Sequence, residues 1–354
     1  TQMFALSQAD AEAYAATIRQ VPCPDDEMHR RMIREYIIQN FSPAPDGRPH
    51  RCLLLVFRGE NAFQEIHDIT GHAYISSHSG ETIRDTYGDL AYGSDGSVRY
   101  FEPAVLTPDR RDTVADDIGL WLRLAAKSPA LLEHSCFYAD PDTVQKTLVL
   151  IKPDSWQQRS SRPGAVLDMF SRTGLRIIAA KLCRMTVAQA LDFYGPVKQA
   201  LRERLAPGIG LRARLILEKE LGVSLPAGVE TALGEVIGVP VAADQFERII
   251  EFMSGTRPRD CREDDFTSDG KVKSLALVYE GEHAIGKIRA VLGPTDPTKA
   301  PGGTVRREFG SDVMVNTAHA SDSVENAARE MDILALKQSN LAVVVNRALR
   351  ELNP

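Results

Sequence analysis

The stretch LALVYEGEHAIGKIRAVLG, residues 275–293, sets the expectation for the fold. It opens with an unbroken apolar run, as a buried strand does, and continues with apolar residues at helical spacing up to a glycine. Residues 53–71, LLLVFRGENAFQEIHDITG, repeat this order. A second pair follows at the same offset, GETIRDTYG at residues 80–88 and GGTVRREFG at 302–310. Two segments that agree without a gap predict two copies of one α/β unit.

The domain boundary is expected in YADPDTVQ, residues 138–145, where Asp and Pro separate two periodic regions. The first copy then takes residues 1–140 and the second 145–354. In the second copy the patterns predict strands at 147–151, 175–185, 275–281 and 313–316, with helices between them. This order predicts an α/β (α+β) fold of the ferredoxin-like β-α-β-β-α-β type, a sheet covered by helices, present in two tandem copies.

Two segments do not fit this pattern. Residues 203–245 have their own helical periodicity without low-complexity character, which predicts a folded helical insertion. Residues 256–270, TRPRDCREDDFTSDG, are polar and predict a long exposed loop.

The composition and net charge of the chain limit the classes of protein to which it can belong. The chain has a formal net charge of -6, with 43% hydrophobic and 25% charged residues. This argues against non-specific binding to nucleic acid or an anionic membrane, which reward a basic surface. No apolar run approaches the ~20 residues that span a bilayer, and no signal peptide is apparent, so we expect a cytoplasmic protein. The scattered cysteines indicate reduced thiols without a zinc site; they are Cys23, Cys52, Cys136, Cys183 and Cys261.

The segment NTAHASDSVENAARE, residues 316–330, contains one histidine among small residues. His319 either ends a strand with its ring hydrogen-bonded to backbone, or is presented to a ligand. Asp322 followed by Glu325 is a capping signature, so a helix start with its positive dipole end, which suits phosphate, is expected just after it. Glu330 lies about two turns along that helix. Its carboxylate can accept a proton from one ring nitrogen and leave the other with a free lone pair.

Three cationic residues stand at element ends beside Gly or Pro: Lys152, Arg289 and Arg306. Residues 293–297 and 299–306 form a loop rich in Gly and Pro between the two arginines. The alternative is an ordinary surface loop with solvated arginines. The chain lacks the G-x-x-x-x-G-K-[ST] phosphate-binding loop and the protein-kinase signatures.

Together these features resemble the nucleoside diphosphate kinases. The similarity covers residues 146–334 apart from the two insertions. The motifs that carry it are KPD at 152–154, FY ending at Tyr194, MSG at 253–255, Arg289 after the V-Y-E-G strand, GPTDP at 293–297, G-T-V-R ending at Arg306, and N-x-x-H-x-S-D-S at 316–323 with Glu330 beyond.

The resemblance implies ping-pong transfer of the γ-phosphate of ATP or another nucleoside triphosphate to a nucleoside diphosphate. His319 is then the group phosphorylated, and Mg²⁺ enters bound to the nucleotide. The implied roles are phosphate binding for Arg289, Thr295 and Arg306, sugar binding for Lys152 and Asn316, proximity to the imidazole for Tyr194, and orientation of the imidazole for Ser321 and Glu330.

The sequence departs from the family at two places in the second copy. Ala320 stands where Gly is expected after the histidine. The aromatic residue that stacks on the base should follow Tyr194, but the helical insertion interrupts the chain there. The pattern resumes with Phe246 beside that position, and Gln245 is a candidate for the position itself. Loss of such stacking weakens binding by roughly 1–3 kcal/mol.

The first copy departs further. Arg84 keeps the second arginine position, whereas His67, Ala73 and Val105 stand about where Arg289, Thr295 and His319 are expected. The K-P-D strand is missing. The first copy is therefore predicted to be inactive and to serve as a packing partner.

Three functions remain open from the sequence. The leading one is an active nucleoside diphosphate kinase, and the second is a nucleotide-binding pseudoenzyme or scaffold with little turnover. The third is a phosphohistidine relay to a protein. The family forms dimers, tetramers and hexamers, so we expect a homo-oligomer with a dimer-like contact inside each chain; three chains supply six units.

Overall fold

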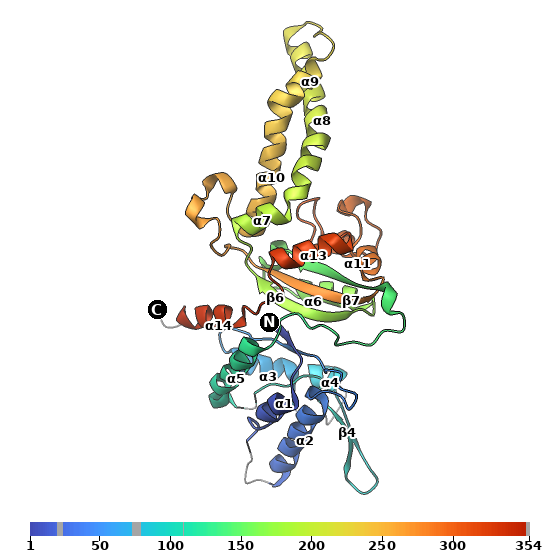
Figure 1. The fold of residues 1–354 in the computed structure, drawn as a ribbon, viewed down its shortest axis with the longest axis vertical. Coiled ribbons are helices and arrows are strands. Elements are labelled where there is room, and N and C mark those ends of the chain that lie inside the picture. Colours follow the sequence, from blue (N-terminus) through green and yellow to red (C-terminus); the bar gives the residue numbers. More distant parts are fainter. Residues whose placement is uncertain (20–23, 73–78, 109, 352–354) are drawn as a thin grey trace. The chain divides into compact units, whose positions relative to one another are not determined.

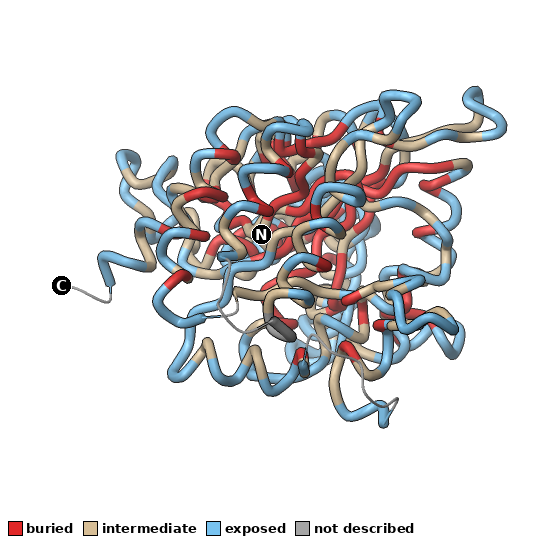
Figure 2. Tube along the Cα trace, turned by 90° about the horizontal axis from the view of Figure 1, so that it is seen from below, coloured by how far each residue is buried: buried red, intermediate tan, exposed pale blue. Residues whose placement is uncertain are grey.

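The computed structural model describes residues 1–19, 24–72, 79–108 and 110–351. The chain forms two compact units (Figure 1). The N-terminal unit comprises Thr1–Phe137, Ile178–Lys181 and Lys337–Pro354, and the C-terminal unit comprises Tyr138–Ile177 and Leu182–Leu336. In Figure 2, which colours the chain by burial, the buried stretches are enclosed by exposed helix faces and loops.

The C-terminal unit is built on a four-stranded sheet. Its strands are β5 (Val144–Ile151), β6 (Arg176–Cys183), β7 (Ser274–Glu282) and β8 (Ala318–Ala320), in the order β6-β7-β5-β8. The strand β6 is shared, because its middle residues Ile178–Lys181 are those counted with the N-terminal unit. The central strand β5 pairs antiparallel with β7 and β8. It ends in four consecutive side chains that are fully buried, which explains its unbroken apolar run: Leu148, Val149, Leu150 and Ile151.

Helices α6 (Arg162–Ser171) and α11 (Ala284–Leu292) follow β5 and β7 along the chain. With the four strands they give the order β-α-β-β-α-β. The ferredoxin-like fold predicted for this unit is therefore confirmed. Its other helical elements are η3 (Pro153–Trp156), α7 (Val187–Phe193), η5 (Pro258–Asp260), η6 (Glu263–Asp265), η7 (Pro297–Lys299), α12 (Val305–Phe309) and α13 (Val324–Ile333).

The helical insertion forms a two-helix hairpin, drawn in yellow-green to yellow-orange in Figure 1. The helix α8 (Gly195–Leu221) runs outward, and α9 (Val229–Leu233), the π-helical η4 (Gly234–Gly238) and α10 (Val239–Ser254) return. Glycines allow the close contact, because a Cβ on Gly210 would lie 2.1 Å from the carbonyl oxygen of Glu230. The chain breaks between α7 and α8 at Tyr194, two residues before Pro196.

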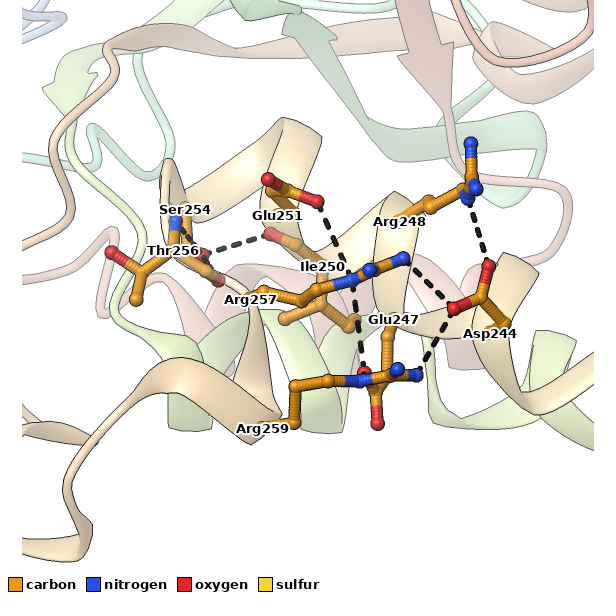
Figure 3. Close-up of polar contacts among 9 residues, drawn as sticks. All are labelled: Asp244, Glu247, Arg248, Ile250, Glu251, Ser254, Thr256, Arg257 and Arg259. Atoms are coloured by element: carbon orange, nitrogen blue, oxygen red, sulfur yellow. Dashed lines mark hydrogen bonds and ion pairs between the residues drawn. The ribbon is translucent and has the colours of Figure 1, made fainter. Parts of the chain in front are cut away.

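An ion-pair network ties the end of α10 to the segment that follows it (Figure 3). Arg257 and Arg259 each place Nη2 3.0 Å from Oδ1 of Asp244, and Arg248 places Nε 2.9 Å from Oδ2 of the same carboxylate. Single exposed ion pairs contribute little, but a shared carboxylate couples these arginines. The segment 256–270, expected as one long loop, contains the short 3₁₀ turns η5 and η6.

Two local predictions near the histidine are wrong. Residues 313–316 are not a strand, because the Asp312 carboxylate accepts hydrogen bonds from the N–H groups of Met314 and Val315 and holds a turn. The strand is β8, two residues later. The helix α13 begins one residue beyond the expected position, since Ser323 and not Asp322 is its N-cap.

The N-terminal unit contains two small antiparallel sheets and several helices. β1 (Gln2–Phe4) pairs with β2 (Cys52–Leu54), and β3 (Asp89–Tyr92) pairs with β4 (Val98–Glu102). The helices are α1 (Gln8–Ala15), α2 (Pro24–Phe41), α3 (Ala62–Thr70), α4 (Ile83–Tyr87), α5 (Val114–Lys127) and α14 (Leu341–Arg350), with the 3₁₀ turn η1 (Arg111–Thr113). The 3₁₀ turn η2 (Pro141–Thr143) belongs to the C-terminal unit.

The core of this unit is aromatic. The Trp121 ring lies 5.0 Å from the ring of Phe4 and 5.0 Å from that of Tyr14, in edge-on geometry. Leu341 and Val345 of α14 belong to the same cluster. Residues 341–350, assigned from the sequence to the second copy, thus pack in the N-terminal unit.

The described residues of the N-terminal unit do not form the second four-stranded sandwich that the repeat predicted. Of the apolar run at residues 53–57 only the first two residues lie in a strand, and Leu55 and Phe57 are 52% and 59% exposed. The helices do repeat, however. Ala62 and Ala284 open α3 and α11, and both helices end in a glycine with positive φ, Gly71 and Gly293.

No helix in the part of the chain that the structure describes is long and apolar enough to cross a membrane. Cys52, Cys136 and Cys261 have free thiols, and Cys23 lies outside the described residues.

Candidate functional site

A cavity of about 570 Å³ opens in the C-terminal unit where β8 meets α11, α12, α13 and the start of α8. Six of the residues singled out from the sequence line it: Tyr194, Arg289, Thr295, Arg306, His319 and Glu330. Four others do not, namely Lys152, Phe246, Asn316 and Ser321.

His319 is the middle residue of β8, opposite Leu150 of β5. Its Nε2 lies 2.9 Å from Oε2 of Glu330, and the Ser321 hydroxyl donates to the same oxygen at 2.6 Å. Because a carboxylate only accepts, we assign the Nε2 proton to this bond and the lone pair to Nδ1. The ring is therefore held by a carboxylate and not by the backbone.

Two aromatic rings contact the imidazole edge-on. The Phe193 and Tyr194 ring centroids lie 5.1 and 6.3 Å from that of His319. The Tyr194 hydroxyl is buried, and no described residue bonds to it. Burial raises the pKa of this phenol, so it stays protonated and able to donate.

Arginine side chains give the cavity positive charge, and two of them, Arg289 and Arg306, are neighbours. Arg306 donates from Nη1 to Gly293 O at 3.0 Å and from Nη2 to Ala318 O at 3.1 Å, which fixes it between the α11–α12 loop and β8. Burial, and then the neighbouring Arg289, lowers the pKa of Arg306 to about 10, so Arg306 remains charged at neutral pH. Neighbouring guanidinium groups in a cavity wall favour an anionic ligand.

Lys152 lies beneath this wall and is almost fully buried. Its ammonium group donates to Met314 O at 2.9 Å and to Asn316 Oδ1 at 2.7 Å. Asn316 donates in turn to Thr295 O at 3.1 Å. Lys152 and Asn316 thus support the loop that carries Thr295 into the cavity wall.

Burial lowers the pKa of Lys152 from 10.5 to about 8. Between these values the unfolded chain holds a proton that the folded chain has lost, so this group makes the unfolding free energy rise with pH. Lys152→Met removes that titration. From about pH 8 to pH 10 we expect wild type to gain about 2 kcal/mol relative to Lys152→Met.

Urea unfolding measures this difference. The chain has two tryptophans, and in a Trp121→Phe background Trp156 reports on the C-terminal unit alone. A difference in unfolding free energy that is flat or falls over that pH range contradicts the assignment.

The side of the cavity expected to receive the base lacks the predicted aromatic residue. Phe246 is buried on α10, where Lys198 Nζ lies 5.8 Å from its ring centroid, and its contact with a base remains a prediction. The start of α8 supplies Pro196 and Val197 to this wall instead. Ala320, which replaces the expected glycine, also lines the cavity.

Sequence reasoning missed Arg329, which lines the cavity and donates to the carbonyl oxygens of Asp192 and Phe193 at 3.1 and 3.2 Å. It ties α13 to the end of α7, next to the aromatic rings on His319. Its only signal in the sequence is its place before Glu330.

The N-terminal unit repeats one part of this arrangement. Arg84 donates from Nη1 to Gly71 O at 2.6 Å and from Nη2 to Val105 O at 3.0 Å, the counterparts of the two bonds of Arg306. By this contact Val105 matches Ala318, so the place of the histidine falls one residue later, at Leu106. His67 is bonded to Pro108 O at 2.6 Å, and Ala73 lies outside the described residues.

Among the described residues no three His, Cys, Asp or Glu side chains gather as a metal site. A divalent cation carried on a ligand needs no such cluster.

In this α/β domain one cavity contains a histidine bonded to a carboxylate and two neighbouring arginines. This arrangement is typical of a site that binds phosphate groups. Residues 145–201 and 264–339 match the family described as Nucleoside diphosphate kinase. The nucleoside diphosphate kinases of Acidiphilium cryptum and Staphylothermus marinus are 28% and 29% identical over 187 and 190 residues. These matches cover 53% and 54% of this chain and 90% and 92% of those proteins. The C-terminal part of the chain, residues 145–339, therefore contains a nucleoside diphosphate kinase family domain.

Among solved structures, the Aquifex aeolicus nucleoside diphosphate kinase is 27% identical, with 55% of this chain and 99% of that chain covered and a TM-score of 0.35. The NDP kinase from Pyrobaculum aerophilum is 24% identical, with coverages of 55% and 100% and a TM-score of 0.37.

Proposed function

We propose that the C-terminal unit transfers the γ-phosphate of a nucleoside triphosphate to a nucleoside diphosphate through phosphorylated His319. One observation carries the proposal: Nε2 of His319 is bonded to Glu330 at 2.9 Å inside a cavity that Arg289 and Arg306 also line. A neutral imidazole with a free Nδ1 is a competent nucleophile at neutral pH.

In the first half-reaction the Nδ1 lone pair attacks the γ-phosphorus. The N–P bond forms as the bond to the β-phosphate oxygen breaks, and the nucleoside diphosphate leaves with that electron pair. Positive charge develops on the ring, and Glu330 stabilises it through the Nε2–H bond. Arg289, Arg306 and Thr295 hold the phosphates, and Mg²⁺ is part of the nucleotide substrate.

In the second half-reaction a terminal phosphate oxygen of the acceptor attacks the phosphorus, and the electron pair of the N–P bond returns to Nδ1. The Tyr194 ring packs edge-on against the imidazole and lines the cavity beside it. Lys152 and Asn316, expected from the sequence to bind the sugar, do not line the cavity, and their part in this proposal is to position Thr295.

The N-terminal unit is, in this proposal, a degenerate copy without activity. The repeated helices and the Arg84 contacts support common origin. Leu106 at the nucleophile position and the full use of Arg84 as a structural donor support inactivity.

A second candidate is a nucleotide-binding scaffold with little turnover. Phe246 outside the cavity and Ala320 at its wall favour this candidate. Both candidates predict nucleotide binding, and only the kinase predicts a covalent intermediate.

Labelling with [γ-³²P]ATP separates the two. We expect an acid-labile, alkali-stable label that maps to the peptide containing His319 and that is removed by a nucleoside diphosphate. The matched control is His283→Ala, which replaces an exposed histidine of the same unit and is expected to label normally. Binding without label supports the scaffold, and label within residues 1–140 overturns the assignment of the inactive copy.

A further inference from the structure

Thr317 has a backbone conformation that its residue type disfavours. Its φ is 74°, in the left-handed region, and its side chain is β-branched and fully buried. Such a residue costs of order 1–3 kcal/mol and persists only when its surroundings hold it. It lies between Asn316 and the three-residue strand that carries His319.

Three groups of Thr317 are bonded to one short segment of the chain. Its N–H donates to Asp154 Oδ2 at 3.2 Å, and its carbonyl oxygen accepts from the Lys152 N–H at 2.9 Å. Its hydroxyl oxygen accepts from Arg162 Nη2 at 2.7 Å. Residues 152–162 therefore supply the surroundings that hold the left-handed conformation.

Arg162 is the residue on which these contacts depend. Its Nη2 also lies 2.8 Å from Asp154 Oδ2 and 2.7 Å from Phe309 O. The Asp154 side chain is 3% exposed, and no described residue bonds to its Oδ1. Removal of Arg162 would leave a buried carboxylate without a cation, which is strongly unfavourable.

We infer that Arg162 and Asp154 are positioning residues that lock Thr317 in its left-handed conformation and so set the place of His319 in the cavity. We call these three residues the Thr317 clamp. If φ of Thr317 relaxes to negative values, the chain enters β8 in a different direction. The 2.9 Å bond between His319 and Glu330 and the approach of Nδ1 to a phosphate then change together.

None of the three residues of the clamp lines the cavity. The groups that bind substrate and the groups that position the nucleophile are therefore separable. Loss of the clamp lowers kcat, because the reacting atoms are misplaced, and leaves KM for nucleotide unchanged. This expectation rests on the proposed kinase function.

The kinetic test uses Arg162→Met, which keeps side-chain length and removes charge and donors. We expect kcat to fall about tenfold to a hundredfold with KM within about twofold of wild type. Adding Thr317→Gly is expected to restore kcat in part, because glycine adopts positive φ without strain. Arg172→Met, an exposed arginine at the end of the same helix, is the control and is expected to behave as wild type.

Thr317→Val tests the clamp with the Arg162–Asp154 pair intact. It removes only the hydroxyl that accepts from Arg162, and we expect kcat to fall about threefold to tenfold. This variant decides the question if Arg162→Met does not fold. The inference is overturned if either folded variant keeps wild-type kcat, if KM changes in place of kcat, or if Thr317→Gly restores nothing.

A measurement without turnover separates this inference from the proposed function. In ¹⁵N–¹H NMR the Nε2 proton of His319 reports its bond to Glu330, and we expect it to exchange with solvent faster in Arg162→Met than in wild type. If wild type transfers no phosphate, the proposed function fails, but faster exchange still supports the clamp. Equal exchange rates reject the clamp even if wild type is an active kinase.

Discussion

His319→Ala is expected to abolish phosphoryl transfer, with a fall in kcat/KM of at least about 10⁴-fold, because the variant has no atom to form the N–P bond. Nucleotide affinity is expected to stay within about threefold of wild type, since Arg289, Thr295 and Arg306 remain in the cavity wall. A coupled assay of transfer from ATP to a deoxynucleoside diphosphate measures the first quantity, and calorimetry with ADP and Mg²⁺ measures the second.

His283→Ala serves as the control for this experiment, because it removes a histidine of the same unit that does not line the cavity. Transfer that persists in His319→Ala contradicts the phosphohistidine intermediate. Wild-type transfer no faster than that of His319→Ala leaves the scaffold as the function of this domain.

The parts of the fold that followed from the sequence are those in which one face or both faces of an element are buried. The apolar second half of β5 and the apolar run of β7 predict strands in a sheet whose two faces are both buried. The position of the Glu330 carboxylate near His319 could also be predicted from the sequence. Eleven residues bring the chain from β8 into α13 and back past the ring, where Glu330 Oε2 lies 2.9 Å from Nε2.

The local structures that could not be predicted depend on single side chains whose hydrogen-bond partners the sequence does not reveal. The apolar residues before Asn316 indicate a strand over 313–316, but the structure has a turn there. The Asp312 carboxylate accepts from the Met314 N–H, and the Asn316 amide donates to Val313 O. Nothing in the sequence marks Arg162 as the partner of Thr317, because the two residues are 155 positions apart and each is ordinary alone. Phe246 matched the family pattern in the sequence. In the structure α8 and α10 continue as a helical hairpin, and the Phe246 ring is buried on α10.

The repeat in the sequence corresponds to local features that the two units share. α3 and α11 start after residues in the left-handed conformation, Asn61 and His283, and both end at glycines whose carbonyl oxygens accept from an arginine. The strand that precedes α3 has three residues, against nine in β7. The helix and arginine contacts are satisfied locally, whereas a central strand needs neighbours on both sides, so the repeated pattern predicted the helices correctly and the sheet wrongly.

Arg306 and Arg84 make the same two kinds of bond in the two units, and their alanine variants are expected to fail in different ways. Arg306→Ala removes a cation from the cavity wall, and we expect kcat/KM to fall about 10²–10³-fold. Arg84→Ala leaves the carbonyl groups of Gly71 and Val105 unpaired, each at a cost of about 1–3 kcal/mol, in a unit without a nucleophile. We expect it to unfold the N-terminal unit at lower urea concentration with kcat/KM within about threefold of wild type.

Single-tryptophan variants make the comparison direct, since Trp121 reports on the N-terminal unit when Trp156 is replaced by phenylalanine. The Trp121 transition is expected to move in Arg84→Ala and to stay in place in Arg306→Ala. Equal losses of transfer in the two variants would mean that both arginines act only by holding loops together. A loss confined to Arg306→Ala together with an unchanged Trp156 transition means that the guanidinium acts on the transferred phosphate, because its bonds to Gly293 O and Ala318 O then contribute little to the stability of the C-terminal unit.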